Sequence, residues 1–191
     1  MVTWVVVEGL VTSGWEQSIK DDSESFEVTD FETRRKKHRL DAEQYVDQCL
    51  KYVFSDIKKG QGHKKVAIFS AGTPGSGKTE LLDYLYPRYQ HIYARLDPDD
   101  FRHYFSEYTG DNAAEFQPAI GYLLTKCFNY AKKHKYNFIY DSTFVAHSSL
   151  ERVQKVINAG YVVKIVYTYS QPRDAWNIIQ GRYQVMYLKH F

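Results

Sequence analysis

The chain has 191 residues, of which 43% are hydrophobic and 16% aromatic, and this is enough apolar material for one folded domain with a buried core. Its 25 basic and 23 acidic side chains give a net charge of +2, which is too balanced to indicate a nucleic-acid or membrane partner by itself. Cys49 and Cys127 fall at apolar positions of separate helical patterns. We therefore expect two buried thiols, no metal cluster of cysteines and a cytoplasmic location.

The first 40 residues carry little regular patterning. "MVTWVVVEGLV" is apolar but has no basic segment before it and is interrupted by Glu8, so we interpret it as a strand or a disordered lead rather than a signal peptide or membrane span. A polar, acidic linker follows. The basic run "RRKKHR" at 34–39 is interpreted as a solvated approach to a helix, with a nucleic-acid patch as the alternative. The helix is predicted after Asp41, a candidate N-cap, because apolar residues then recur at helical spacing up to Ile57.

Strand and helix patterns alternate from residue 66 onwards. Short apolar runs rich in β-branched and aromatic residues predict strands at 66–71, 91–97, 137–141 and 161–169. Helical patterns begin at Lys78, Pro98, about 120, Ser148 and Pro172. This order is typical of an α/β fold with a mainly parallel sheet flanked by helices. Ligands of such sheets bind at the carboxyl ends of the strands.

The segment from Gly72 to Thr79 reads "GTPGSGKT" and joins a predicted strand to a predicted helix. A polyphosphate needs several backbone N–H donors aimed at one point, so the chain must wrap closely around it, which Gly75 and Gly77 allow. The N-terminus of the following helix adds its dipole. Lys78 is predicted to reach the β and γ phosphates, and Thr79 to offer its hydroxyl to Mg²⁺. The fold expected is therefore the P-loop NTPase type.

The nucleotide is predicted to be ATP rather than GTP, because the guanine-reading patterns N-K-x-D and D-x-x-G are both missing from the sequence. ATP and Mg²⁺ are thus the expected cofactors. The predicted nucleotide-binding residues are Gly72, Thr73, Pro74, Gly75, Ser76, Gly77, Lys78 and Thr79.

Acidic side chains follow two of the predicted strands. In "RLDPDDFR", Asp97 precedes Pro98 and is a good helix N-cap, whereas Asp99 is the candidate that orients and deprotonates a substrate hydroxyl. "NFIYDST" ends a strand in Asp141, which is predicted to hold Mg²⁺ or a substrate hydroxyl, with a capping role before a turn as the alternative. Thr143 is a further candidate for contacting the substrate.

Arg182 has apolar neighbours three and four residues away on both sides within the last predicted helix. An arginine on such a face either extends along the surface to reach water or meets an anion. A guanidinium matches phosphate oxygens in bidentate geometry, so Arg182 is predicted to stabilise charge on the transferring phosphoryl group.

From about residue 64 to 187, the chain resembles the zeta toxins, P-loop kinases of bacterial toxin–antitoxin systems. Four segments match in order: "GTPGSGKT", "LDPDDFR", "KYNFIYDST" and "AGYVVKIVYTYSQPRDAWNIIQGRYQVMY". By this resemblance, Asp99 takes the place of the catalytic aspartate and Arg182 that of a phosphate-binding arginine. The chain differs from the family pattern at Asp141, where glutamate is usual, and at Ser142, where glycine is usual.

The resemblance implies ATP-dependent phosphorylation of a hydroxyl of a nucleotide sugar, namely the 3′-hydroxyl of the amino sugar in UDP-N-acetylglucosamine. It also implies an antitoxin protein as partner. The expected organisation is an N-terminal extension of unknown role at 1–40 and a P-loop kinase domain at 41–191. The kinase domain would be truncated, because the family continues through another arginine-bearing segment.

Two other functions stay open at this point. The chain could be a P-loop kinase that acts on polynucleotide ends or another metabolite, since "DST" after a strand and the basic run at 34–39 would suit such a substrate. It could also be a non-catalytic ATP-binding module that acts through a partner. In each case Lys78 and Thr79 bind the nucleotide, and only the kinases need Asp99 and Arg182.

Overall fold

The computed structural model describes residues 3–7, 27–58, 65–144 and 147–188. The chain divides into two compact units. The first unit contains residues 1–8, 56–96 and 131–191, and the second contains residues 9–55 and 97–130. Within the described ranges, no helix is long and apolar enough to cross a membrane.

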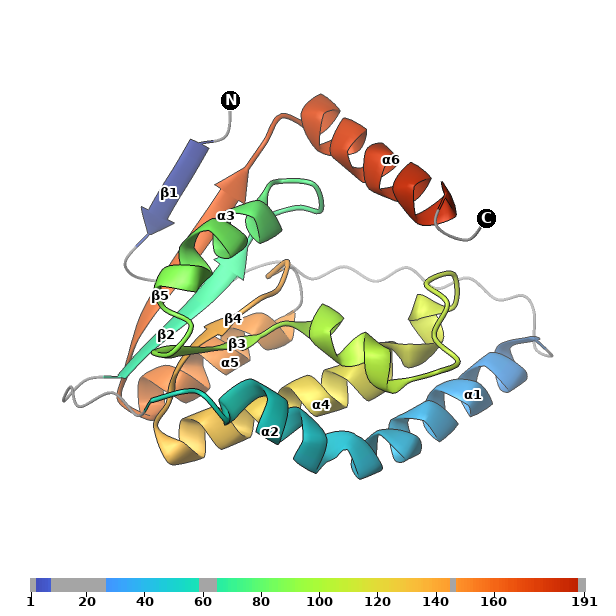
Figure 1. Cartoon of the computed structure of the whole chain (residues 1–191), viewed down its shortest axis with the longest axis horizontal. Helices are drawn as coiled ribbons and strands as arrows, with labels where there is room; N and C mark the ends of the chain where they lie inside the picture. The colour runs from blue at the N-terminus through green and yellow to red at the C-terminus, as the bar shows by residue number, and fades with distance from the viewer. Residues whose placement is uncertain (1–2, 8–26, 59–64, 145–146, 189–191) are drawn as a thin grey trace. The chain divides into compact units, whose positions relative to one another are not determined.

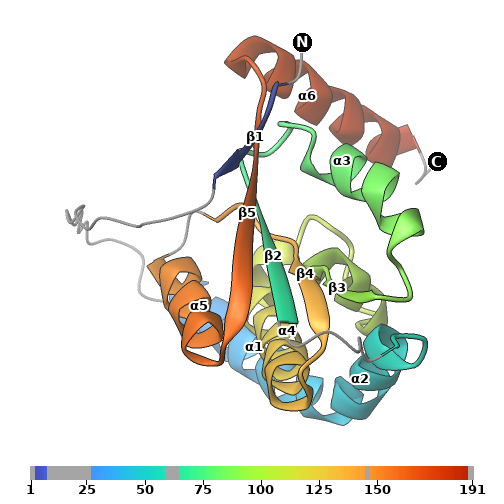
Figure 2. The ribbon, with the colours of Figure 1, turned by 90° about the vertical axis from the view of Figure 1, so that its left-hand side faces the viewer.

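The first unit is built on a five-stranded sheet with the strand order β1-β5-β2-β4-β3 (Figure 1). The strands are β1 (Thr3–Val7), β2 (Lys65–Ala71), β3 (Tyr93–Leu96), β4 (Asn137–Tyr140) and β5 (Tyr161–Tyr169). β5, β2, β4 and β3 run parallel, and β1 pairs antiparallel with β5 at one edge, as the view along the sheet in Figure 2 shows. The predicted mainly parallel sheet of P-loop type is confirmed, although the second predicted strand is shorter than 91–97.

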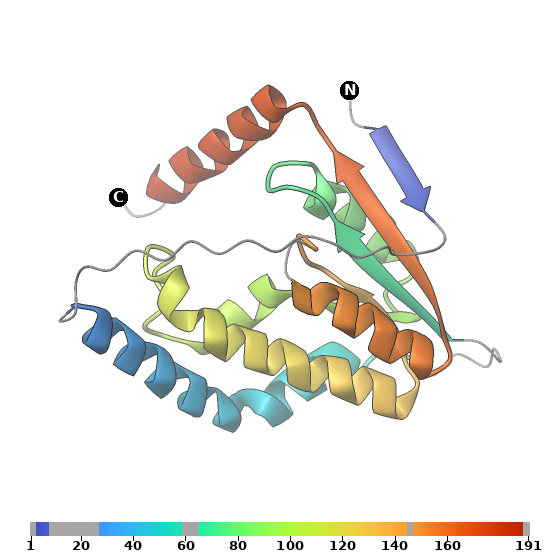
Figure 3. The same cartoon turned by 180° about the vertical axis from the view of Figure 1, so that it is seen from behind.

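Helices cover both faces of this sheet. The first unit contains α3 (Lys78–Leu85), η2 (Tyr86–Arg88), α5 (His147–Asn158) and α6 (Pro172–Leu188). α3 lies on one face, and α5 lies on the opposite face beside β5 (Figures 1 and 3). The central strands are apolar because they are covered on both sides, and Phe69 and Phe138 from β2 and β4 are fully buried.

The second unit is helical. It contains α1 (Glu27–Asp41), η1 (Ala42–Tyr45), α2 (Val46–Phe54), the 3₁₀ helix η3 (Pro98–Tyr104) and most of α4 (Ala113–His134). Phe101, Phe116 and Leu123 are fully buried in its core. Cys49 and Cys127 are also buried there as free thiols, as predicted.

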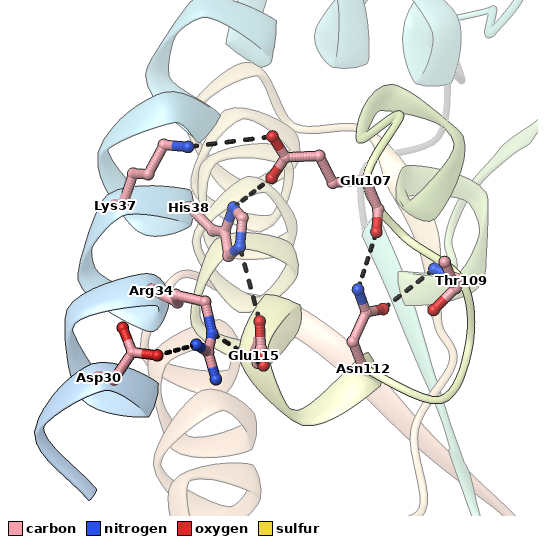
Figure 4. A network of polar contacts seen from close by, with 8 residues as sticks. All are labelled: Asp30, Arg34, Lys37, His38, Glu107, Thr109, Asn112 and Glu115. Carbon is pink, nitrogen blue, oxygen red and sulfur yellow. Dashed lines mark hydrogen bonds and ion pairs between the residues drawn. The ribbon is translucent and has the colours of Figure 1, made fainter. Parts of the chain in front are cut away.

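A network of charged side chains ties α1 to the start of α4 (Figure 4). The His38 ring is buried and stacks on Phe116, with 4.0 Å between the ring centroids. Its Nδ1 lies 3.8 Å from a carboxylate oxygen of Glu107, and its Nε2 lies 3.9 Å from one of Glu115. Arg34 places its Nε 3.1 Å from Glu115 and also pairs with Asp30. These polar contacts and the ring stacking hold α1 as an integral part of the second unit.

Two interpretations of the N-terminal region are wrong. The basic run 34–39 does not precede a helix but lies inside α1. Asp41 does not cap the next helix: its backbone is helical (φ −60°, ψ −28°) and its side chain makes no capping bond. Both errors have one cause, since the chain stays helical from α1 through η1 into α2 and has no helix N-terminus at Asp41. By contrast, β1 confirms the strand interpretation of the first apolar run.

Candidate functional site

The glycine-rich loop between β2 and α3 has positive φ angles at Gly72, Gly75 and Gly77, and at the first two a side chain would also clash. Gly72 has φ +137°, and a Cβ added there would lie 2.4 Å from the carbonyl oxygen of Thr168. Gly75 has φ +73°, and its Cβ would lie 2.4 Å from the carbonyl oxygen of Ala175. Glycine therefore serves the loop both through its conformational freedom and by allowing the end of β5 and the first turn of α6 to approach closely.

Hydroxyl groups from the end of β5 hold the outer side of this loop. The hydroxyls of Ser76 and Thr168 are 2.6 Å apart and buried. Ser170 donates its hydroxyl to the carbonyl oxygen of Gly75 at 3.3 Å. The N–H groups of Gly72 and Ser76 donate to the carbonyl oxygens of Thr143 and Thr73, so the start of α3 is the main face of the loop for an anion.

Lys78, the first residue of α3, folds back over the loop. Its Nζ donates to the carbonyl oxygens of Gly72 at 2.7 Å and Thr73 at 2.8 Å. The ammonium group is thereby held against the loop backbone, where it can meet the outer phosphates of a bound nucleotide. The side chains of Thr73, Pro74 and Thr79 are exposed around it.

Asp141 follows β4 directly and has defined partners. It is buried, and its carboxylate accepts a hydrogen bond from the hydroxyl of Ser70 at 2.8 Å and forms an ion pair with Arg95 at 3.2 Å. Its backbone N–H donates to the carbonyl oxygen of Leu96 at 3.0 Å. Two residues later, the carbonyl oxygen of Thr143 accepts from the N–H of Gly72 at 3.3 Å, and the Thr143 side chain is exposed. Asp141 and Thr143 thus belong to the segment that borders the loop.

The side chains in this region fit a Mg²⁺ ion bound together with nucleotide. The described residues contain no group of three or more His, Cys, Asp and Glu that could hold a metal without help. Mg²⁺, however, prefers oxygen ligands and is commonly held by one or two protein groups plus the phosphates of a substrate. The hydroxyl of Thr79 and the carboxylate of Asp141 are oxygen ligands of the kind this requires.

Asp99 lies in the second unit, in the first turn of η3. Asp97 is the N-cap of this helix, as predicted, and accepts the N–H of Asp99 at 2.9 Å. Asp99 forms an ion pair with Arg102 at 2.8 Å, and its side chain is 67% exposed. It is thus an accessible carboxylate with a defined orientation, and its catalytic role stays a prediction.

Arg182 lies in α6, seven residues or about two helical turns after Ala175, whose backbone touches the loop. Its side chain lies outside the described part of the structure. The same helix that packs on Gly75 therefore carries the predicted phosphate-binding arginine, and the role of Arg182 stays a prediction too.

The side chains that support the predicted residues were not predicted from the sequence. Ser70 is a polar residue inside an apolar strand, and Arg95 alternates with the buried Ala94 and Leu96 in β3. A polar side chain within two residues of a strand's end was a usable signal in both cases, because such residues lie close to the ligand-binding edge of a parallel sheet.

A parallel sheet, a glycine-rich loop after its central strand, and a lysine at the start of the next helix together define a P-loop fold. The family model for zeta toxin matches residues 51–189. The chain therefore belongs to the zeta toxin family.

One solved structure with the same fold comes from the PezAT chromosomal toxin–antitoxin system of the human pathogen Streptococcus pneumoniae. It is 19% identical, aligns with a TM-score of 0.68 and covers 78% of this chain. The present chain spans 65% of that protein's length. No curated protein sequence is similar enough to count as a match.

Proposed function

We propose that this protein is an ATP-dependent phosphotransferase that moves the γ-phosphate of ATP, with Mg²⁺, to a hydroxyl of a nucleotide sugar such as UDP-N-acetylglucosamine. The observation that carries the proposal is the loop itself, in a chain of the zeta toxin family: its glycine conformations and the Lys78 ammonium held against it suit a polyphosphate.

Each predicted residue has one role in this reaction. The loop N–H groups and Lys78 bind the β and γ phosphates, and Thr79 and Asp141 would hold Mg²⁺, which neutralises charge on these phosphates. The acceptor oxygen attacks the γ-phosphorus and its proton passes to the Asp99 carboxylate, while the bond from the γ-phosphorus to the bridging oxygen breaks and ADP leaves. Arg182 would stabilise the charge on the group in transfer.

The acceptor is proposed from family membership, and one feature of the structure bears on the alternative. Basic residues of the run 34–39, which could have supplied affinity for polynucleotides, are engaged with neighbours in the second unit. Arg34 and Arg35 pair with carboxylates, Lys37 lies 3.9 Å from Glu107, and Arg39 lies over the ring of Tyr122. The paired carboxylates lower the positive charge that this run presents, which gives a small advantage to the small-molecule acceptor.

The family's toxin–antitoxin setting extends the proposal to a partner. The structural relative comes from such a system, and we propose that an antitoxin protein also controls this chain by covering its nucleotide site. The proposed location is the cytoplasm, where ATP and nucleotide sugars are available.

The test is a transfer assay on the full chain with γ-labelled ATP and Mg²⁺. The acceptors are UDP-N-acetylglucosamine, its analogue without the 3′-hydroxyl, UDP alone, a 5′-hydroxyl oligonucleotide, and none. The proposal expects label on UDP-N-acetylglucosamine and none on the 3′-deoxy analogue or UDP. Label on the oligonucleotide would instead identify a polynucleotide kinase, and ATP binding without transfer to any acceptor would identify a non-catalytic module.

A further inference from the structure

Arg95 is the residue that connects Asp141 to the helix after the phosphate-binding loop. One guanidinium nitrogen, Nη2, lies 3.2 Å from the Asp141 carboxylate at the end of β4. The other, Nη1, lies 2.6 Å from the Asp83 carboxylate on α3. A single planar side chain on β3 thus joins a strand end and a helix of the first unit.

The two ends of this bridge have very different surroundings. The side chains of Arg95 and Asp141 are 14% and 11% exposed, whereas that of Asp83 is 59% exposed. Water screens the outer pair, so it contributes little. The inner pair is largely shielded, and without Arg95 the Asp141 carboxylate would be a buried charge lacking its counterion.

Arg95 and Ser70 together fix the orientation of the Asp141 carboxylate. Arg95 engages Oδ2, and the Ser70 hydroxyl donates to Oδ1 at 2.8 Å. The Ser70 oxygen is itself held, because it accepts the backbone N–H of Ser142 at 2.9 Å. With a donor on each oxygen, the carboxylate plane cannot turn freely.

The outer end of the bridge reaches the face of α3 that carries Asp83. Asp83 lies four residues after Thr79, so the two residues share one face of this helix, about one turn apart. Because Arg95 contacts both Asp83 and Asp141, its guanidinium lies beside the face of α3 that also carries Thr79. Thr79 and Asp141 are the two oxygen ligands proposed above for Mg²⁺.

We propose that Arg95 is a positioning residue for phosphoryl transfer: its ion pair fixes the Asp141 carboxylate toward the nucleotide's phosphates and their cation. Arg95 acts through Asp141 and does not touch the substrate. The expected effect on kcat rests on the proposed function. The expected effect on the geometry of the cation site requires only that the chain binds nucleotide.

The test compares three variants of the full chain. R95M removes the guanidinium and keeps an unbranched apolar side chain, R95K keeps a cation, and D83N is the matched control because it removes only the exposed partner. Nucleotide affinity is measured in EDTA, and kcat and KM are measured in the transfer assay. Electron paramagnetic resonance of Mn²⁺, bound with ATP in place of Mg²⁺, reports the geometry of the cation site without requiring transfer.

For R95M we expect unchanged nucleotide affinity in EDTA, since the loop and Lys78 are intact, and a kcat lowered by about a hundredfold, as for a misplaced reactive group. Its Mn²⁺ spectrum should differ from that of the native chain. R95K should recover part of kcat, and D83N should retain both the native kcat and the native spectrum. A native spectrum and kcat in R95M would overturn the proposal, as would an equal loss in D83N.

Two further outcomes are distinguishable. If R95M does not fold, S70A replaces it, since this variant removes the other bond to the carboxylate and only one hydroxyl. S70A should lower kcat at constant nucleotide affinity, and a native kcat there would overturn the proposal. If the native chain binds ATP but transfers to no acceptor, the proposed function fails, while the Mn²⁺ spectra of R95M and D83N still decide the role of Arg95.

Discussion

The carbonyl oxygen of Ala175, in the first turn of α6, occupies the space that a side chain on Gly75 would need: an added Cβ would lie 2.4 Å from it. Backbone atoms cannot move aside as a flexible side chain can. This contact makes the phosphate-binding loop and the last helix of the first unit one packed structure.

The variant G75A should therefore lose both stability and nucleotide affinity. A non-glycine residue at its φ of +73° costs about 1 kcal/mol in conformation, and the clash adds about 1–3 kcal/mol, measured as a lower free energy of unfolding in urea. Gly160 supplies the matched control, because its φ is +81° but nothing lies near its Cβ. G160A should thus show the conformational cost alone, and equal losses in both variants would contradict the steric explanation.

Replacing Lys78 tests the nucleotide site directly. K78A should weaken ATP binding by about tenfold to a hundredfold, because hydrogen bonds to charged groups contribute about 1.5–3 kcal/mol. Calorimetric titration with ATP measures this effect. K155A is the control, since Lys155 is an exposed lysine of α5 in the same unit. The ATP affinity of K155A should equal that of the native chain. Native affinity in K78A would contradict the assignment of the loop as the phosphate site.

Replacing Asp99 separates binding from transfer. D99N keeps the shape of the side chain but cannot accept the acceptor's proton, so kcat should fall by at least about a hundredfold, within the range of general base catalysis. ATP affinity should stay within a factor of about two, since Asp99 is predicted to act on the acceptor. D100N is the neighbouring control, and transfer that survives in D99N would refute the base assignment.

The network around His38 predicts a stability difference between two glutamates. Glu115 is 17% exposed and faces both Arg34 and His38, so E115Q should lower the free energy of unfolding by about 1–2 kcal/mol. Glu151 is the control, because it is 56% exposed and pairs with Lys155 along α5. E151Q should change the free energy of unfolding by less than about 0.5 kcal/mol. Urea denaturation followed by circular dichroism makes the comparison, and equal effects would mean that the network does not hold α1.

The two thiols should be unreactive in the folded protein. Burial raises the pKa of Cys49 to about 11 and that of Cys127 to about 12, above the ordinary thiol value of 9.0, so the reactive thiolate is scarce at pH 8. Ellman's reagent should react with neither thiol in the native chain and with both in guanidinium chloride. Because the folded state holds these protons more tightly, stability should fall as pH rises from about 9 through 11. Rapid labelling of the native chain would contradict the burial.

The first unit was largely predictable because its strands are buried and separated by clear loop signals. β5 was predicted at its observed bounds. The loop was recognised from the spacing of its glycine, lysine and threonine residues, because all three are required for binding phosphates with Mg²⁺. Hydrophobic periodicity reports burial within one helix or strand, so it predicts those elements whose burial pattern lies within their own sequence.

What the sequence did not reveal depends on contacts between distant residues. Thr168 supports Ser76, and Arg95 supports Asp141, across separations that no local pattern encodes. The polar helix α1 was not predicted for the same reason, because its sequence has no apolar stripe. Arg34 and His38 instead contact carboxylates on α4 and on the loop before it. Tertiary contacts of this kind override local propensity.

The pairing of β1 with β5 has a consequence for any shortened form of this protein. Thr3 pairs with Tyr169 and Val7 with Ile165, so residues before the family-matched region cover the outer hydrogen-bonding edge of β5. A fragment that lacks only residues 1–8 would expose the N–H and C=O groups of that strand, which is a template for further strands. Such a fragment should self-associate, measured by light scattering, at concentrations where the full chain stays monodisperse. Recombinant forms of this protein should therefore retain β1.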